Sequence, residues 1–403
     1  MKTILKSLFL AAAVVLAFTS CKDDEGLNST ATPSVKYIRS TDPALSEIYL
    51  TSASMGELIA IVGEDLEGVC SVRFNDVEAK LNPTYITSHT VLVNVPGTLP
   101  QQITNTITLK TKKGRTCVVE NFITKAPIPA IASVTCEWAQ PGQEIVISGN
   151  YFFKKADGSD IELTIGGIPA AITSFTTTEV TATVPAGIDT SSKQRIILSN
   201  DNGTGRSMFY LYDTDDVFID FEDLSWDGWG RSSGDIFTEN GISGGYMLFK
   251  GKSASWNWDE NLSLFYCNLN EDGSVNRRLL PVGAEPADYV LKFELRVDSW
   301  SDLFMGIWFS DQYNTFSEAG PEAQCHWRTP YQQPDVYPQG AWRTATIPLT
   351  SFSVAKDESE ARTLTISQMK NLCIFFFGAL DDEANAGVPL QIAVDNFRLV
   401  KKQ

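Results

Sequence analysis

Short runs of alternating apolar and polar residues recur along most of the chain. The clearest spans residues 289–298, where from residue 291 every second position is apolar and the positions between are charged. Residues 303–309 and 372–377 are nearly continuous apolar runs, as strands covered on both faces would be. Helical periodicity is weak, and residues 358–370 are the one helix candidate. The pattern predicts an all-β protein.

The same strand pattern occurs twice between residues 56 and 213. The matched segments follow one another in the same order: 56–63 with 142–149, 72–79 with 163–170, 90–97 with 179–186, and 107–110 with 196–199. Each is a short β-type run closed by Gly, Asn or Pro, as two-sheet sandwiches require. Gly142–Phe152 carries the Gly-bounded strand signature of IPT/TIG immunoglobulin-like domains, which both repeats resemble. The resemblance implies two such domains, over residues 35–125 and 126–213.

The two boundaries of the second repeat differ in stiffness. Pro127 and Pro129 fix φ at the first and favour an extended, stiff join, whereas residues 212–216 lack proline and leave more freedom to bend. Neither repeat holds a catalytic motif, and His89 has no acidic or metal-binding partner nearby in the sequence. Trp138 is assigned to core or interdomain packing. We interpret both repeats as spacers for a last domain over residues 214–403.

The amino terminus looks like a secretion signal. Lys2 and Lys6 form a basic segment before an apolar run over residues 8–18. This run is too short to span a bilayer. Small residues then lead into Cys21, which resembles the acylated cysteine of a lipobox. The acidic residues 22–25 resemble the signal that sends lipoproteins of Bacteroidetes-type bacteria to the outer face of the outer membrane. We expect residues 1–20 to be a signal peptide and 21–34 a lipidated tether; ordinary secretion is the alternative.

Charge and cysteine content narrow the function classes. The net charge of −17 over 403 residues argues against a nucleic-acid partner, which needs a basic face. Apart from Cys21, the cysteines have no metal-ligand spacing, so we expect buried free thiols, with a Cys70–Cys117 disulfide as the alternative. The chain therefore suits a protein with a neutral ligand.

The last domain is rich in tryptophan. Of the nine tryptophans only Trp138 precedes it. In the run Trp256, Asn257, Trp258 and Asp259, flat rings alternate with hydrogen-bonding side chains, and Trp229 lies on an earlier loop. An indole laid on a pyranose buries the C–H face of the sugar, which contributes about 1–3 kcal/mol by analogy with base stacking. Amides and carboxylates bind the sugar's hydroxyls, so this mixture predicts carbohydrate recognition.

A second aromatic group lies in residues 324–338. Three prolines forbid an interior strand there and predict a rigid loop. We expect Trp327, Arg328 and Tyr331 on this loop to contact a ligand. Three further tryptophans lie at or inside predicted strands and are assigned to packing: Trp300, Trp308 and Trp342.

The chain offers little for catalysis. It has no G-x-S-x-G, no H-E-x-x-H, no phosphate loop and only two histidines. A glycosidase needs two carboxylates about 5–10 Å apart, and no acidic pair alternates among aromatics along a strand. Asp220, Glu222 and Asp223 come closest, and they equally suit a structural Ca²⁺. We expect no catalytic residue and no cofactor, with that Ca²⁺ as the open alternative.

The order of parts resembles the surface glycan-binding proteins of Bacteroidetes polysaccharide utilization loci, whose last domain is of the xyloglucan-binding type. The resemblance implies a jelly-roll-like β-sandwich with an aromatic platform for a β-glucan or xyloglucan-like polysaccharide, at Trp229, Trp256 and Trp258. It also implies non-catalytic capture at the cell surface, beside a TonB-dependent importer and a partner glycan-binding lipoprotein. The alternatives are a jelly-roll glycoside hydrolase and a protein-binding surface adhesin.

Overall fold

The computed structural model describes residues 31–45, 47–100, 102–155, 159–222, 235–252, 260–300, 303–311, 323–352, 364–378 and 389–402. The chain forms two compact units, Met1–Pro127 and Ile128–Gln403. Within these residues the regular structure is almost all strand, and the α-helix α2 spans only Thr329–Gln332. None of the helices in this part of the chain is long and apolar enough to cross a membrane. The predicted all-β class is confirmed.

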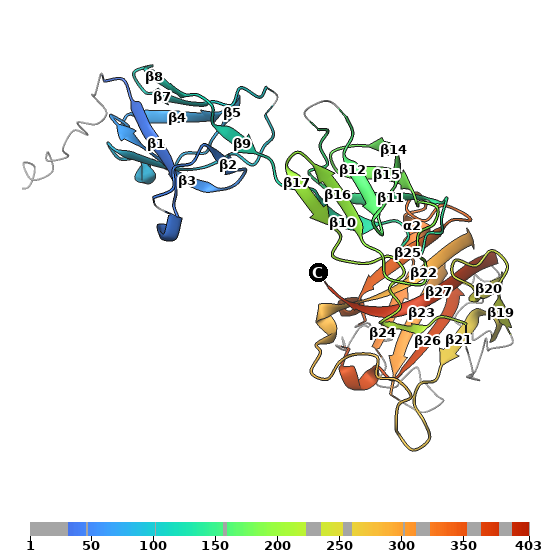
Figure 1. Cartoon of the computed structure of the whole chain (residues 1–403). Helices are drawn as coiled ribbons and strands as arrows, with labels where there is room; N and C mark the ends of the chain where they lie inside the picture. Colours follow the sequence, from blue (N-terminus) through green and yellow to red (C-terminus); the bar gives the residue numbers. More distant parts are fainter. Residues whose placement is uncertain are drawn as a thin grey trace, which may run out of the picture. The chain divides into compact units, whose positions relative to one another are not determined.

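The first unit contains a sandwich of two antiparallel sheets (Figure 1). One sheet has the order β1 (Ser34–Ser40), β3 (Leu58–Glu64), β6 (Thr90–Asn94). The other has the order β5 (Val77–Glu78), β4 (Val69–Phe74), β7 (Ile107–Thr111), β8 (Thr116–Val119). A short parallel pair, β2 (Ser52–Ser54) with β9 (Ile123–Lys125), completes it. Alternate residues such as Ile59, Ile61 and Phe74 face inward and form the core.

The second repeat has the same central strand arrangement, with one additional strand, β14, at the edge of its first sheet. Its first sheet has the order β10 (Ala130–Val134), β11 (Glu144–Asn150), β15 (Glu179–Thr183), β14 (Ala171–Phe175). Its second sheet has the order β13 (Ile168–Pro169), β12 (Glu162–Ile165), β16 (Ile196–Asn200), β17 (Gly203–Arg206). The strands β3, β4, β6 and β7 of the first repeat therefore correspond to β11, β12, β15 and β16. The repeat read from the sequence is confirmed.

The glycine shared by the two repeats marks a close approach of two backbones. A Cβ on Gly63 would lie 1.8 Å from the carbonyl oxygen of Ser34, and one on Gly149 would lie 2.0 Å from that of Ala130. In both repeats the partner strand shifts register at this place, as at a β-bulge. Only glycine fits such a contact, which explains why the signature strand ends on it.

The last domain is a two-layer antiparallel sandwich. The larger sheet has the order β19 (Ile236–Phe237), β20 (Tyr246–Lys252), β27 (Pro389–Lys401), β22 (Tyr289–Ser299), β25 (Trp342–Pro348), with β18 (Val217–Ile219) also on β27. The smaller sheet has the order β21 (Ser263–Tyr266), β26 (Asn371–Gly378), β23 (Leu303–Ser310), β24 (Ala323–Trp327). Between them lies an aromatic core in which the rings of Phe293 and Phe397 stack 4.8 Å apart.

The second repeat is fused to the last domain, so the freedom to bend expected at residues 212–216 is absent. Arg398 on β27 is only 1% exposed, and its guanidinium binds Glu137 of the second repeat at 2.6 Å and Glu294 of β22 at 2.9 Å. The same guanidinium lies 4.2 Å from the ring centroid of Trp138, which confirms the packing role of that tryptophan. Lys292 gives Glu137 a second cation at 2.5 Å.

Burial and charge act in opposite directions on the two acids of this junction. Burial, the largest influence on Glu294, raises the pKa of its carboxyl. Burial also opposes ionisation of Glu137, but the charges of Arg398 and Lys292 together hold its pKa below the ordinary value. Both carboxylates therefore depend on cations that come from the last domain.

Replacing the shared cation should destabilise the second unit. Arg398→Met leaves Glu294 buried without its cation, which typically costs about 3–5 kcal/mol. Chemical denaturation would measure the loss. The control is Lys154→Met, which breaks an exposed pair with Asp160 at 3.5 Å and should cost less than about 1 kcal/mol. Equal small losses in the two variants would contradict a structural role for the buried network.

Candidate functional site

The predicted site residues fall into two groups. Six lie outside the described residues: Cys21, Trp229, Trp256, Asn257, Trp258 and Asp259. Trp327, Arg328 and Tyr331 are described, and they belong to the end of β24 and the start of α2. The first proline of the predicted loop, Pro330, lies in α2, so it does not interrupt the strand that precedes it.

The prediction that Trp327 contacts a ligand is wrong. Its side chain is 8% exposed and belongs to the main core between the sheets. The ring meets Phe293 at 5.6 Å, Trp300 at 6.0 Å and Tyr337 at 5.9 Å, each edge to face. The reason is that residues 323–327 form a strand, in which alternate side chains face opposite sides of the sheet. Trp308 and Trp342 are also buried, and Trp300 packs partly buried against the core, as predicted.

The outward positions of the same strands form a mixed aromatic and basic surface. The ring of Phe304 on β23 lies 6.0 Å from that of His326 on β24. The guanidinium of Arg328 lies 5.1 Å from the Phe304 ring and 5.8 Å from the Tyr331 ring. Tyr331 is 43% exposed. We call these four residues the edge patch. Sequence reasoning missed Phe304 and His326, although the strand alternation at β23 and β24 contains the signal.

The outer face of the smaller sheet is aromatic beyond the edge patch as well. Trp308 and Phe375 meet edge to face at 4.8 Å, and with Phe265 and Cys373 they form a small buried cluster separate from the main core. Phe304 packs partly buried against this cluster. The edge patch therefore lies at the margin of a buried aromatic cluster, which holds the Phe304 ring in place.

The start of β21 lies at the same end of the smaller sheet as Phe304, two strands away from it. Ser263 at the start of β21 pairs with Phe375, and the neighbouring pairs join Phe377 to Phe304. Residues 256–259, themselves outside the described part, end four residues before β21 begins.

The electrostatics of the edge patch suit an uncharged ligand with hydroxyl groups. Burial lowers the pKa of His326 to about 4, so its imidazole is neutral near pH 7 and offers one donor and one acceptor nitrogen. The guanidinium of Arg328 supplies several fixed donors, and the rings of Phe304 and Tyr331 supply apolar faces. The patch can therefore stack on C–H surfaces and bind hydroxyls, but it carries no acid–base pair.

A metal-binding cluster is missing from the parts of the chain that the structure describes. No group of three or more His, Cys, Asp or Glu residues there is placed to hold a metal ion. Of the three acids considered for Ca²⁺, Asp223 lies outside these parts, and Glu222 accepts a hydrogen bond from the Gly245 N–H at 2.7 Å. The cysteines of these parts are free thiols, including Cys70 and Cys117.

Comparison with known proteins shows which class of protein the chain resembles. Residues 211–401 match the family of the surface glycan-binding protein B xyloglucan binding domain, and residues 129–212 match the IPT/TIG domain family. The crystal structure of a surface glycan-binding protein from Prevotella bryantii aligns with 93% of this chain and 100% of that chain, at 26% identity and a TM-score of 0.68. The resemblance to Bacteroidetes surface glycan-binding proteins is confirmed: the chain joins an IPT/TIG domain to a domain of that xyloglucan-binding family.

Two other relatives are more partial or more distant. An IPT/TIG domain-containing protein from Bacteroides ovatus is 31% identical over 156 residues, which cover 36% of this chain and 31% of that protein. The match thus spans about a third of the relative's length. A surface glycan-binding protein B from a complex xyloglucan utilization locus in Bacteroides uniformis has 16% identity and a TM-score of 0.46 over 92% of this chain and 100% of that chain.

The neutral state of His326 can be tested by titration. Because its pKa is lowered to about 4, the ring resonances should stay constant from pH 8 to 5.5 in NMR spectra assigned with His326→Gln. In the unfolded chain the imidazole has its ordinary pKa of about 6.5. As the pH is lowered, the unfolded chain therefore takes up this proton before the folded chain does. Stability should therefore fall as the pH drops from about 6.5 towards 4, and less so in the variant. A titration midpoint near 6.5 in the folded protein would contradict the burial of the ring.

Proposed function

We propose that the last domain binds a neutral polysaccharide, a β-glucan or xyloglucan-like chain, without cleaving it. The edge patch would supply Arg328 and Tyr331, and the residues predicted from the sequence, Trp229 and the run Trp256, Asn257, Trp258 and Asp259, would complete the site. The observation that carries the proposal is the exposed Tyr331 ring held 5.8 Å from the Arg328 guanidinium, beside Phe304, in a domain of the xyloglucan-binding family. No cofactor is needed for this function.

The chemistry of the patch supports capture of a sugar chain. Each aromatic ring that stacks on a pyranose contributes about 1–3 kcal/mol, by analogy with base stacking, and the neighbouring polar groups orient the hydroxyls. Arg328 lies over two rings, which limits its freedom before a ligand arrives and reduces the entropy lost on binding. Substrate cleavage would need two carboxylates about 5–10 Å apart, which the edge patch does not contain.

The proposal includes a place for the protein in the cell. Lipidation at Cys21, after removal of residues 1–20, would anchor the chain in the outer membrane with the domains exposed at the cell surface. From there the protein would supply captured glycan to an outer-membrane glycanase and a TonB-dependent importer, beside a partner glycan-binding lipoprotein. The lipobox-like sequence and the acidic residues 22–25 support this part of the proposal.

Removing an exposed ring from the site should weaken glycan binding. Tyr331→Ala should reduce the affinity about three- to tenfold, and Trp256→Ala or Trp258→Ala tenfold or more, because each 1.4 kcal/mol changes the affinity about tenfold. Isothermal titration calorimetry of the purified chain against xyloglucan, mixed-linkage β-glucan, mannan and xylan would give the affinities and the ligand class.

The matched control is Tyr85→Ala, which removes a tyrosine of the first unit that is 49% exposed and should leave the affinity unchanged. Absence of binding to every glycan would refute the proposed function and favour a protein-binding adhesin. Release of reducing sugar from any of the four polysaccharides would favour the hydrolase instead.

A further inference from the structure

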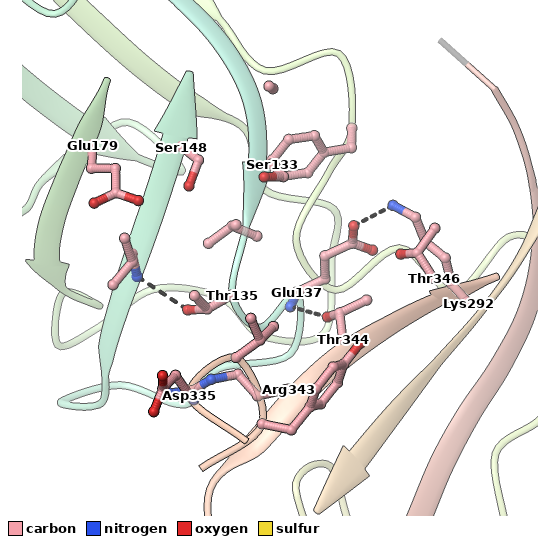
Figure 2. Close-up of a pocket in the computed structure, with 16 residues that line it drawn as sticks. Ser133, Thr135, Glu137, Ser148, Glu179, Lys292, Asp335, Arg343, Thr344 and Thr346 are labelled. Carbon is pink, nitrogen blue, oxygen red and sulfur yellow. Dashed lines mark hydrogen bonds and ion pairs between the residues drawn. The ribbon is translucent and has the colours of Figure 1, made fainter. Parts of the chain in front are cut away.

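A cleft of about 500 Å³ lies at the junction of the second repeat and the last domain, on different elements from the edge patch. Figure 2 shows its two walls. One wall is the outer face of the first sheet of the second repeat, where Ser133, Ser148 and Glu179 form a row across β10, β11 and β15. The other wall is the outer face of β22 and β25, where Lys292 and Thr346 are cross-strand neighbours. Residues 335–337 and Arg343 close one end.

The two walls are fixed relative to each other by hydrogen bonds at the base of the cleft. The Thr344 N–H donates to the Thr135 carbonyl at 3.0 Å, and the Glu137 N–H donates to the Thr344 Oγ1 at 2.7 Å. The ion pair between Glu137 and Lys292, at 2.5 Å, adds a third link. The cleft is therefore formed before any ligand arrives, so binding loses little to ordering of the protein.

The lining of the cleft suits a ligand with many hydroxyl groups. It presents several hydroxyl side chains: Ser133, Thr135, Ser148 and Thr346. Carboxylates and a guanidinium, which bind vicinal hydroxyls well, come from Glu179, Asp335 and Arg343. Rings of Phe209 and Tyr337 provide apolar surface in the same cleft.

The charges of the lining exclude a strongly anionic ligand. The Lys292 ammonium is already paired with Glu137, so it adds no free positive charge. Of the remaining charged groups, Glu179 and Asp335 are acidic and only Arg343 is basic. A uronate or sulfate would meet two like charges for one opposite charge. A neutral sugar would meet both donors and acceptors.

We propose that this cleft is a second carbohydrate-binding site, which takes a neutral segment of about two or three sugar residues, since ligand clefts of about 300–1,000 Å³ enclose small molecules. The proposal takes its ligand class from the proposed function but concerns different residues and both domains of the second unit. The second repeat and the last domain are rigidly joined. A polysaccharide bound at the edge patch and the cleft together would therefore gain affinity from the second contact, without the entropy loss of ordering a flexible linker between the two sites.

Filling the cleft tests the site. Ser148 faces outward on β11, between Ser133 and Glu179, so Ser148→Trp places an indole in the cleft without entering the core of the repeat. Thr346→Trp does the same from the opposite wall, where the side chain is exposed. The control is Val62→Trp, since Val62 precedes Gly63 as Ser148 precedes Gly149 in the other repeat.

The measurement uses a chain whose first site is disabled by Trp256→Ala, Trp258→Ala and Tyr331→Ala. Saturation-transfer NMR and calorimetry with cellotriose should detect weak saturable binding. Adding Ser148→Trp or Thr346→Trp should weaken that binding at least tenfold, and Val62→Trp should not change it. Trigalacturonate, an anionic trisaccharide, should bind at least tenfold more weakly than cellotriose.

Each opposite result has a distinct meaning. If the unmodified chain binds β-glucan but the disabled chain binds no cellotriose, the cleft proposal is wrong and the proposed function stands. If cellotriose binds the disabled chain and neither filling variant affects it, the ligand lies elsewhere and the cleft proposal is again wrong. If the unmodified chain binds no glycan at all, both proposals fall.

Discussion

The buried guanidinium of Arg398 is the interaction on which the second unit depends. A cation this far from water is stable only because Glu137 and Glu294 both bind it and the Trp138 ring covers it. Two of these partners come from the second repeat and one from the last domain. Separating the two domains would break the Glu137–Arg398 pair and remove the Trp138 ring that covers the guanidinium, so the network favours one arrangement of the two domains.

That arrangement changes the role of the second repeat. The chain pattern suggests two equal spacers, and the first repeat is indeed a compact unit by itself. The second repeat instead shares a hydrophobic cluster with the last domain, in which Trp138, Tyr246 and Trp342 are buried together. Its outer sheet face becomes one wall of a cleft whose other wall belongs to the last domain. The second repeat thus contributes one wall of the proposed second site, because the charge network holds it against the last domain.

The fold was largely predictable from the sequence, and the site only in part. Strand alternation at residues 289–298 and the matched glycines at 63 and 149 reflect local constraints, namely burial of one face and close backbone approach. At Trp327 the same local reasoning fails. The prolines that follow it suggest a loop, but the strand ends before the first of them and turns the indole inward. The side chains that point outward there, His326 and Arg328, meet Phe304 of β23, a contact that depends on strand pairing.

The sequence by itself determined the all-β class, the two repeats, and the likeness to surface glycan-binding proteins, because period, turn residues and order of parts are properties of the chain alone. Tertiary structure decided which aromatics are buried, which side chains form the edge patch, and that the second repeat is rigidly joined to the last domain. Those features depend on pairs far apart in sequence, such as Glu137 with Arg398 and Phe304 with Arg328. Burial of a charge or a ring is a property of such pairs, and one-dimensional patterning does not specify them.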